Sequence, residues 1–252
     1  MLTNDVTLIL TCCVSPNVAN PLWSGTPELR ESQYREAIGW YLKNTNYDII
    51  VSENSGFDLS NGFEEYSERA EFLTYCDNGK NGDRGKGYKE MEILEYVYHN
   101  SKTLKKNLGG VISKITGRLI LLNIKEIVTS IQKEYDKKGK NTTGFISAYK
   151  NSTRPFSDCR YVFFSINFFP YLLSKKDIIH DGHNFEMITA ECIKEAVKDG
   201  FYFIYPRYMS RTHGVASGVG HILDKTDKDF FMESMKHNVR KILFDMRILP
   251  LR

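Results

Sequence analysis

The sequence predicts an α/β fold, with a mostly parallel central sheet that carries helices on both faces. Short β-branched segments alternate with segments of helical spacing through the first 140 residues, a pattern typical of parallel sheets. At 252 residues the chain can bury a sizeable core, and 41% hydrophobic and 26% charged residues are typical of a soluble globular protein. No apolar run has the length that a bilayer-spanning helix needs.

Four strands and three helices are expected in the first half of the chain. The strands are apolar, rich in β-branched residues, and followed by polar or turn residues. They are VTLILTCC (6–13), DIIVSE (48–53), EFLTYC (71–76) and VISKI (111–115). The helices have apolar residues three and four positions apart. They lie within 26–45, from the glycine-rich loop to about Leu104, and within 124–139.

The pattern changes beyond residue 140, but neither repeats nor a linker are visible. We expect a strand running into a helix in CRYVFFSINFFPYLL (159–173), a helix in 180–200 and a further strand in FYFIYPRYM (201–209). A single domain over 1–252 with an elaborated C-terminal third is therefore predicted.

The tail 224–252 predicts an amphipathic basic helix. One side of it gathers apolar residues, namely Phe230, Met235, Val239, Ile242, Leu243 and Met246. Such a helix either packs on the core or docks on a membrane surface through its basic face.

Charge and cysteine content narrow the functional classes. A net charge of +3 does not by itself indicate nucleic-acid binding. Five cysteines without CxxC spacing indicate reduced thiols and a cytoplasmic location. The apolar segment VTLILTCCV lacks the basic flank and cleavage site of a secretory signal, and is interpreted as a buried strand.

The common nucleotide and metal motifs are absent. The chain has no GxxxxGK[ST] and no GxGxxG after the first strand. Its D-x-D, Asp227 to Asp229, is better explained as the start of the last helix than as a metal site. His180, Asp181 and His183 offer metal-ligand types, but three ligands so close in one loop form a weak pattern. No cofactor is therefore expected.

Cations instead follow the predicted strands, where ligands bind in parallel sheets. They are Arg84, Lys86 and Lys89 in the glycine-rich loop, and Lys114 and Arg118 around Gly117. One interpretation is a solvated loop with ordinary surface charges. The other is a diphosphate site, in which the cations and the positive end of the following helix stabilise a departing nucleoside diphosphate.

An ordered set of motifs supports the second interpretation. The segments are LTCCVSPN, VSENSGF, RGKGYKEMEILEYVYHNS, KITGRLILLN, SDCRYVFFSINFF, HDGHNFE and GVASGVG. In this order they resemble bacterial glycosyltransferases of capsule and O-antigen (lipopolysaccharide) gene clusters, from about Leu8 to Gly220. This sequence has Lys89 where such motifs often show glycine, and Cys159 where serine is common.

The resemblance implies a GT-A-like fold, with a nucleotide-sugar-binding half in 1–140 and an acceptor half in 141–252. It also implies a nucleotide-diphosphate sugar as donor and a glycan or lipid-linked oligosaccharide as acceptor. The implied location is the cytoplasm, including the inner face of the plasma membrane. The residues implied for the donor diphosphate and nucleotide are Lys86, Tyr88, Glu90, Lys114, Thr116, Gly117, Arg118, Asn54, Ser55, Arg211 and His213. Asp158 and Arg160 are implied for the sugar or acceptor.

The KITGR turn falls where a GT-A fold usually has its D-x-D, which implies a metal-independent enzyme with Lys114 or Arg118 replacing the ion. Glu186 and then Asp181 are the candidates for the base of an inverting transfer. Partial desolvation beside Phe185 is expected to raise the pKa of Glu186, whereas the helix dipole lowers that of Asp181. Two other classes stay open: another nucleotide-dependent transferase, and a non-catalytic polyanion- or nucleic-acid-binding protein.

Overall fold

The structure is a computed structural model that describes residues 6–16, 25–77, 80–138, 141–145, 158–180, 182–215, 223 and 226–246. Its main sheet has the strand order β3-β2-β1-β4-β7-β6-β8. The bounds are β1 (Val6–Cys12), β2 (Asp48–Glu53), β3 (Ala70–Thr74), β4 (Val111–Thr116), β6 (Thr142–Phe145), β7 (Tyr161–Ser165) and β8 (Tyr202–Phe203). A smaller sheet pairs β5 (Leu119–Leu121) with β9 (Thr212–Gly214).

The predicted mostly parallel sheet is confirmed. β1 pairs in parallel with β2 and β4, β2 with β3, and β6 with β8, whereas β7 is antiparallel to both β4 and β6. The four strands expected in the first half are neighbours in this sheet, so their carboxyl ends meet at one edge.

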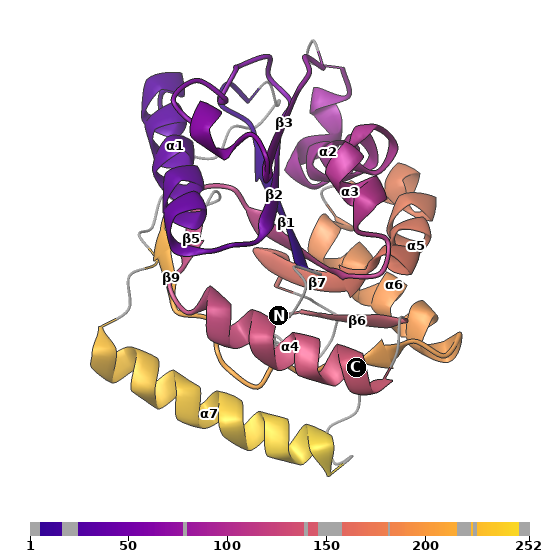
Figure 1. Cartoon of the computed structure of the whole chain (residues 1–252). Coiled ribbons are helices and arrows are strands. Elements are labelled where there is room, and N and C mark those ends of the chain that lie inside the picture. Colours follow the sequence, from indigo (N-terminus) through magenta and orange to yellow (C-terminus); the bar gives the residue numbers. More distant parts are fainter. Residues whose placement is uncertain are drawn as a thin grey trace.

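Helices cover both faces of the sheet, as Figure 1 shows. They are α1 (Pro27–Asn44), α2 (Gly85–Asn100), α3 (Lys102–Lys106), α4 (Ile124–Lys138), α5 (Phe169–Ser174), α6 (Phe185–Lys198) and α7 (Asp227–Asp245). Short 3-10 turns occupy Glu64–Tyr66, Gly82–Arg84, Ile166–Phe168 and Lys176–Ile178. Among the described residues, none of the helices combines the length and hydrophobicity that crossing a bilayer requires.

Successive residues of a strand pack into two separate hydrophobic cores, because their side chains alternate between the two faces of the sheet. Leu8 and Leu10 of β1 lie in the core beneath α1 and α4, and Ile9 between them lies in the core beneath α2, α5 and α6. Both faces of β1 are therefore buried, which is why its sequence is continuously apolar rather than alternating.

Two expectations for the C-terminal part need correction. The strand expected in 201–209 is limited to Tyr202–Phe203, and Pro206 beyond it has no N–H to donate to a ladder. Of the two alternatives for the last helix, packing of its apolar side on the core is wrong, since Met235, Val239, Ile242 and Met246 of α7 are more than half exposed.

Candidate functional site

The turn after β4 lies directly against the end of β1. The Gly117 N–H donates to the Thr11 carbonyl at 3.0 Å. A Cβ at this glycine would lie 2.6 Å from the Cys12 Sγ atom and 2.8 Å from the Thr11 carbonyl oxygen. Because no side chain fits there, the glycine allows the turn to cross the end of β1, and Arg118 follows on its far side.

We therefore expect Gly117→Ala to destabilise the fold. Overpacking against a backbone carbonyl typically costs about 1–3 kcal/mol, and each kcal/mol lowers the Tm of a chain this size by about 2–4 °C. Thermal unfolding measures this, with Gly109→Ala as the matched control, because a Cβ at Gly109 meets nothing within 4 Å. A Gly117→Ala variant as stable as the control would show that this close approach does not exist.

Arg118 is a buried arginine whose guanidinium is only partly hydrogen-bonded. Its side chain is 3% exposed, and its Nη1 atom donates to Gln33 Oε1 at 2.8 Å. The Nε and Nη2 atoms are buried and have no hydrogen-bond partner within the described part of the chain. Leaving a buried donor unpaired costs about 1–3 kcal/mol, and more for a charged group. The arrangement favours an anion that accepts from these two nitrogens.

A second buried guanidinium comes from α1. The helix begins at Pro27 after Thr26, whose hydroxyl accepts from the Leu29 N–H at 3.3 Å, and this start turns Arg30 toward the sheet. Arg30 Nε donates to the carbonyls of Cys13 at 2.9 Å and Val14 at 3.0 Å. Arg30 thereby fixes the backbone that follows β1 and places a second positive charge beside Arg118.

Lys86 is the third cation and stands in the first turn of α2. Gly85 before it has φ +81, a left-handed conformation that glycine adopts without strain. Burial lowers the pKa of Lys86, and the positive charges of Arg30 and Arg118 lower it further. The three side chains are thus close enough to repel one another, and we call Arg30, Lys86 and Arg118 the cation cluster.

A second group of charges lies around Lys114 of β4. This lysine is 1% exposed, donates to the Cys159 carbonyl at 2.6 Å and forms an ion pair with Glu90 of α2. Glu90 Oε1 also accepts from the Thr11 hydroxyl at 3.1 Å. Lys114 therefore connects β1, β4, α2 and the segment before β7 through its own contacts and those of Glu90.

Glu186, in the first turn of α6, belongs to the same group. Burial raises its pKa, and the carboxylates of Glu90 and Asp158 raise it further, whereas a hydrogen bond from its own backbone N–H and the charge of Lys114 lower it; the net shift is upward. Asp158 itself is buried and accepts from Arg160 Nε at 2.8 Å. We call Glu90, Asp158 and Glu186, gathered around Lys114, the carboxylate cluster.

The two clusters adjoin. Lys86 and Glu90 are one helical turn apart on α2 and therefore lie on the same side of that helix. Next to them, the Thr116 N–H donates to the Arg160 carbonyl at 3.0 Å, which ties the turn carrying Arg118 to the segment carrying Asp158. An anion at the cation cluster would thus lie beside a carboxyl group with a raised pKa.

Asn54 and Ser55 lie at the same edge, held by a residue that the sequence did not single out. The buried Glu53 carboxylate accepts from the backbone N–H groups of Val14, Ser55 and Phe57, each at 2.9 Å. It fixes the loops after β1 and β2 together. Asn54 Oδ1, buried next to it, lacks a hydrogen-bond partner among the residues the structure describes.

Other predicted residues have different surroundings. Tyr88 is buried in the core beneath α2, with the Arg84 guanidinium 3.9 Å from its ring centre, and Arg84 pairs with Asp177. Lys89 pairs with Asp77 at 3.0 Å and with Glu92 at 2.9 Å, so it braces the glycine-rich loop.

Two predicted residues in and beside β9, Arg211 and His213, lie near carboxylates of this chain. Arg211 pairs with Asp227 at 2.5 Å, and His213 Nε2 lies 3.8 Å from Glu36 Oε1. Gly214, by contrast, lies against the Arg118 carbonyl, 2.5 Å from where its Cβ would be. The second base candidate, Asp181, and most of the GVASGVG segment lie outside the described residues.

The donor types at the end of β4 do not fit a divalent ion, because Lys114 and Arg118 are both cationic. Within the described residues, no three His, Cys, Asp or Glu side chains are arranged so that they could hold a metal ion, and this includes the carboxylate cluster around Lys114. His183 Nε2 lies 2.8 Å from Glu191 Oε1, and His180 Nδ1 accepts from the Gly182 N–H at 3.1 Å.

No protein-family model matches this chain, and no curated protein matches its sequence. Three solved structures are similar at a TM-score of 0.42. A cytidylyltransferase from Leptospira borgpetersenii is 13% identical and covers 79% of this chain and 74% of its own. A 4-diphosphocytidyl-2C-methyl-D-erythritol synthase is 10% identical, and the match covers 93% of this chain and 99% of that one. A protein described as a nucleotide-diphospho-sugar transferase from Desulfovibrio desulfuricans is 10% identical, and the match covers 80% of this chain and 79% of that one. Similarity at this level assigns no function to the chain.

Proposed function

We propose that the protein is a glycosyltransferase that moves a sugar from a nucleotide-diphosphate donor to a hydroxyl acceptor. The observation that carries this proposal is the partly unpaired, buried guanidinium of Arg118 beside Arg30 and Lys86. Three converging cations match the charge of a diphosphate and would stabilise it further as it departs with the nucleoside.

The carboxylate cluster supplies the other half of the reaction. A carboxylate whose pKa lies nearer the working pH is a better general base than an ordinary one, and burial beside Glu90 and Asp158 has this effect on Glu186. In an inverting transfer Glu186 would take the proton of the acceptor hydroxyl while the cation cluster receives the leaving diphosphate. Asp158 and Arg160 would contact the sugar or the acceptor, which we propose is a glycan or lipid-linked oligosaccharide of a surface polysaccharide.

The reaction products separate this proposal from other nucleotide-dependent transfers. The protein is incubated with a panel of nucleotide-diphosphate sugars, with water taking the place of the acceptor hydroxyl and receiving the sugar, and, separately, with nucleoside triphosphates plus sugar phosphates. Release of a nucleoside diphosphate from one of the sugars, absent in Glu186→Gln, is expected. Release of pyrophosphate from a triphosphate would instead identify a nucleotidyltransferase. Salt-sensitive oligonucleotide binding without any turnover would indicate a polyanion-binding protein.

Diphosphate affinity is expected to depend on the protonation of Lys86. Because its pKa is lowered, Lys86 loses its proton at a lower pH than an ordinary lysine. A bound diphosphate favours the protonated form, so affinity is full below this pKa and falls as the pH rises through it. Calorimetric titration with a nucleoside diphosphate across alkaline pH measures the decline. Lys86→Arg, which stays charged, should flatten the curve, and an unchanged curve would remove Lys86 from the site.

Transfer is expected to continue in the presence of EDTA, because cations rather than metal ligands stand at the end of β4. Rates measured with and without EDTA should agree. Loss of transfer that manganese or magnesium restores would contradict this expectation and direct attention to the segment His180–His183.

A further inference from the structure

α7 carries an exposed apolar stripe with a regular spacing. Met232, Met235, Val239, Ile242 and Met246 are separated by three, four, three and four residues. Their exposed fractions are 49%, 52%, 56%, 57% and 62%. Alternating steps of three and four place them in one line along the helix, the arrangement of a coiled-coil seam.

The stripe points away from the protein because the opposite side of α7 is attached to it. His237 is 4% exposed, and its Nε2 atom lies 2.9 Å from the Pro206 carbonyl oxygen. The Arg211 guanidinium lies 5.6 Å from the ring centre of Phe230, which is on this attached side. Figure 1 shows α7 along the outside of α4, at the edge of the molecule.

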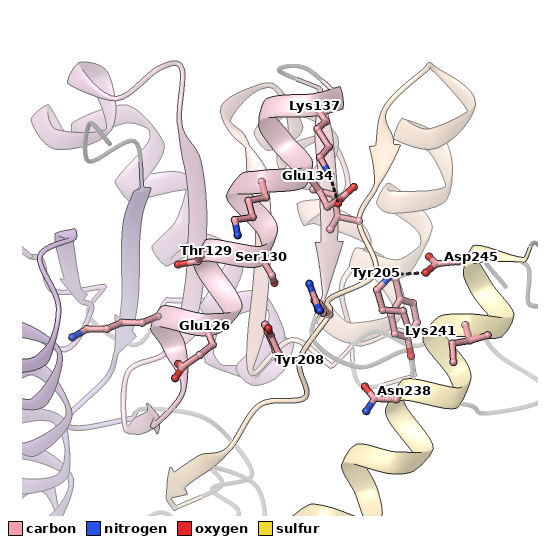
Figure 2. A pocket seen from close by; sticks show the side chains of 15 residues that line it. Glu126, Thr129, Ser130, Glu134, Lys137, Tyr205, Tyr208, Asn238, Lys241 and Asp245 are labelled. Atoms are coloured by element: carbon pink, nitrogen blue, oxygen red, sulfur yellow. Dashed lines mark hydrogen bonds and ion pairs between the residues drawn. The ribbon is translucent and has the colours of Figure 1, made fainter. Parts of the chain in front are cut away.

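A groove of about 970 Å³ separates α7 from α4, and Lys241 and Asp245 pair across one turn on its wall. Figure 2 shows polar side chains of both helices facing this groove. Of the stripe, Ile242 alone reaches the groove wall among the residues that line it. The other four stripe residues are left without cover from the described part of the chain.

The charges of α7 distinguish between possible occupants. The helix carries four basic residues, Lys228, Lys236, Arg240 and Lys241, and four acidic ones, Asp227, Asp229, Glu233 and Asp245. A helix that lies on an anionic membrane has a polar face rich in Lys and Arg, whereas this balance gives an anionic surface no net attraction.

Along one flank of the stripe the charges are ordered rather than mixed. Asp229 and Glu233 occupy its first half, and Lys236 and Arg240 its second half, at steps of four, three and four residues. This flank therefore runs parallel to the stripe, with an acidic and a basic end. In an antiparallel pair of identical helices, the acidic half of each flank faces the basic half of the other. A parallel two-fold pair would instead place this flank against the opposite flank of the partner helix, which carries Phe231 and Asn238 and offers no such charge pairing.

We propose that α7 is a homodimerisation helix, which packs its stripe antiparallel against α7 of a second copy of this chain. The apolar seam and the self-complementary flank both fit a two-fold, isologous interface. Lys236 and Arg240 of one copy then lie opposite Glu233 and Asp229 of the other, a register that brings Met232, Met235 and Val239 of both copies into the seam. The cation and carboxylate clusters of each copy take no part in this contact.

Sedimentation velocity over a range of protein concentrations tests the proposal. A concentration-dependent dimer is expected for the wild type. Met235→Asp with Val239→Asp should abolish it, and, since both residues are exposed, folding should be unaffected. Leu108→Asp is the control, an equally exposed leucine at 60% outside α7. Dimerisation unchanged in the double variant, or a wild type that stays monomeric, would overturn the proposal.

Charge reversal tests the orientation. Asp229→Lys with Glu233→Lys makes the flank wholly basic, and Lys236→Glu with Arg240→Glu makes it wholly acidic. Each pair should weaken dimerisation about tenfold or more, since several exposed ion pairs become repulsive. All four substitutions together should restore it. Failure of this rescue would overturn the antiparallel pairing. A monomeric protein that binds phosphatidylglycerol vesicles, and that no longer binds them after Lys236→Glu with Arg240→Glu, would overturn the proposal in favour of membrane docking.

Discussion

Glu186→Gln is expected to reduce sugar transfer by about 10²–10⁴-fold while donor binding stays intact. A positioned general base contributes a factor of this size, and the amide keeps the shape of the side chain but cannot accept the proton. The raised pKa of Glu186 also sets a pH dependence. Because the base must be ionised, kcat/KM rises with pH through that pKa, and this rise should vanish in the variant.

The matched control is Glu191→Gln on the same helix, where the carboxylate contacts His183 at the surface and should contribute little. Asp181→Asn is the informative comparison. If Asp181→Asn abolishes transfer and Glu186→Gln turns over normally, Asp181 is the base and the order proposed for the two is reversed.

Arg118→Ala is expected to reduce turnover about a hundredfold. A charge-assisted contact to a leaving group that gains charge in the transition state is worth about 3 kcal/mol. The fold should not lose stability to the same degree, because the substitution also removes two unpaired buried donors. Steady-state kinetics and thermal unfolding of the same preparation separate the two effects.

Arg84→Ala is the control for this variant. Arg84 belongs to the glycine-rich loop but pairs with Asp177 and lies over Tyr88, so its loss should leave turnover within a few-fold of the wild type. An Arg118→Ala enzyme with near-normal turnover would remove the KITGR turn from the site.

The fold was largely predictable because its strands are local features. The runs around Ile9, Ile50 and Ile112 are continuously apolar, and a chain that alternates such runs with amphipathic helices forms a parallel sheet. What periodicity could not provide is the side of α7 that meets the protein. A stripe of Met and Val is suited to a core or to a partner alike, and the attachment through His237 depends on the position of Pro206, 31 residues away.

The site was predictable only in part, because much of it depends on contacts between residues that are far apart in the sequence. Lys86 and Arg118 were suspected because cations follow glycines at strand ends, where a ligand approaches. Arg30 was missed, since in the sequence it is one charge on an amphipathic helix. Only the packing of α1 brings it to the carbonyls of Cys13 and Val14. Glu53 was missed because its role is visible only in the N–H groups that surround it.

The central claim is that the cation cluster binds a nucleotide diphosphate, and a crystal structure of the protein with a nucleoside diphosphate tests it most directly. The account predicts phosphate oxygens about 3 Å from Arg118 Nε and Nη2, with Lys86 and Arg30 beside them. The nucleobase of the bound nucleotide should lie along the edge formed by the loops after β1 and β2. A nucleotide bound elsewhere, for instance in the groove between α4 and α7, with Arg118 left unpaired, would contradict it.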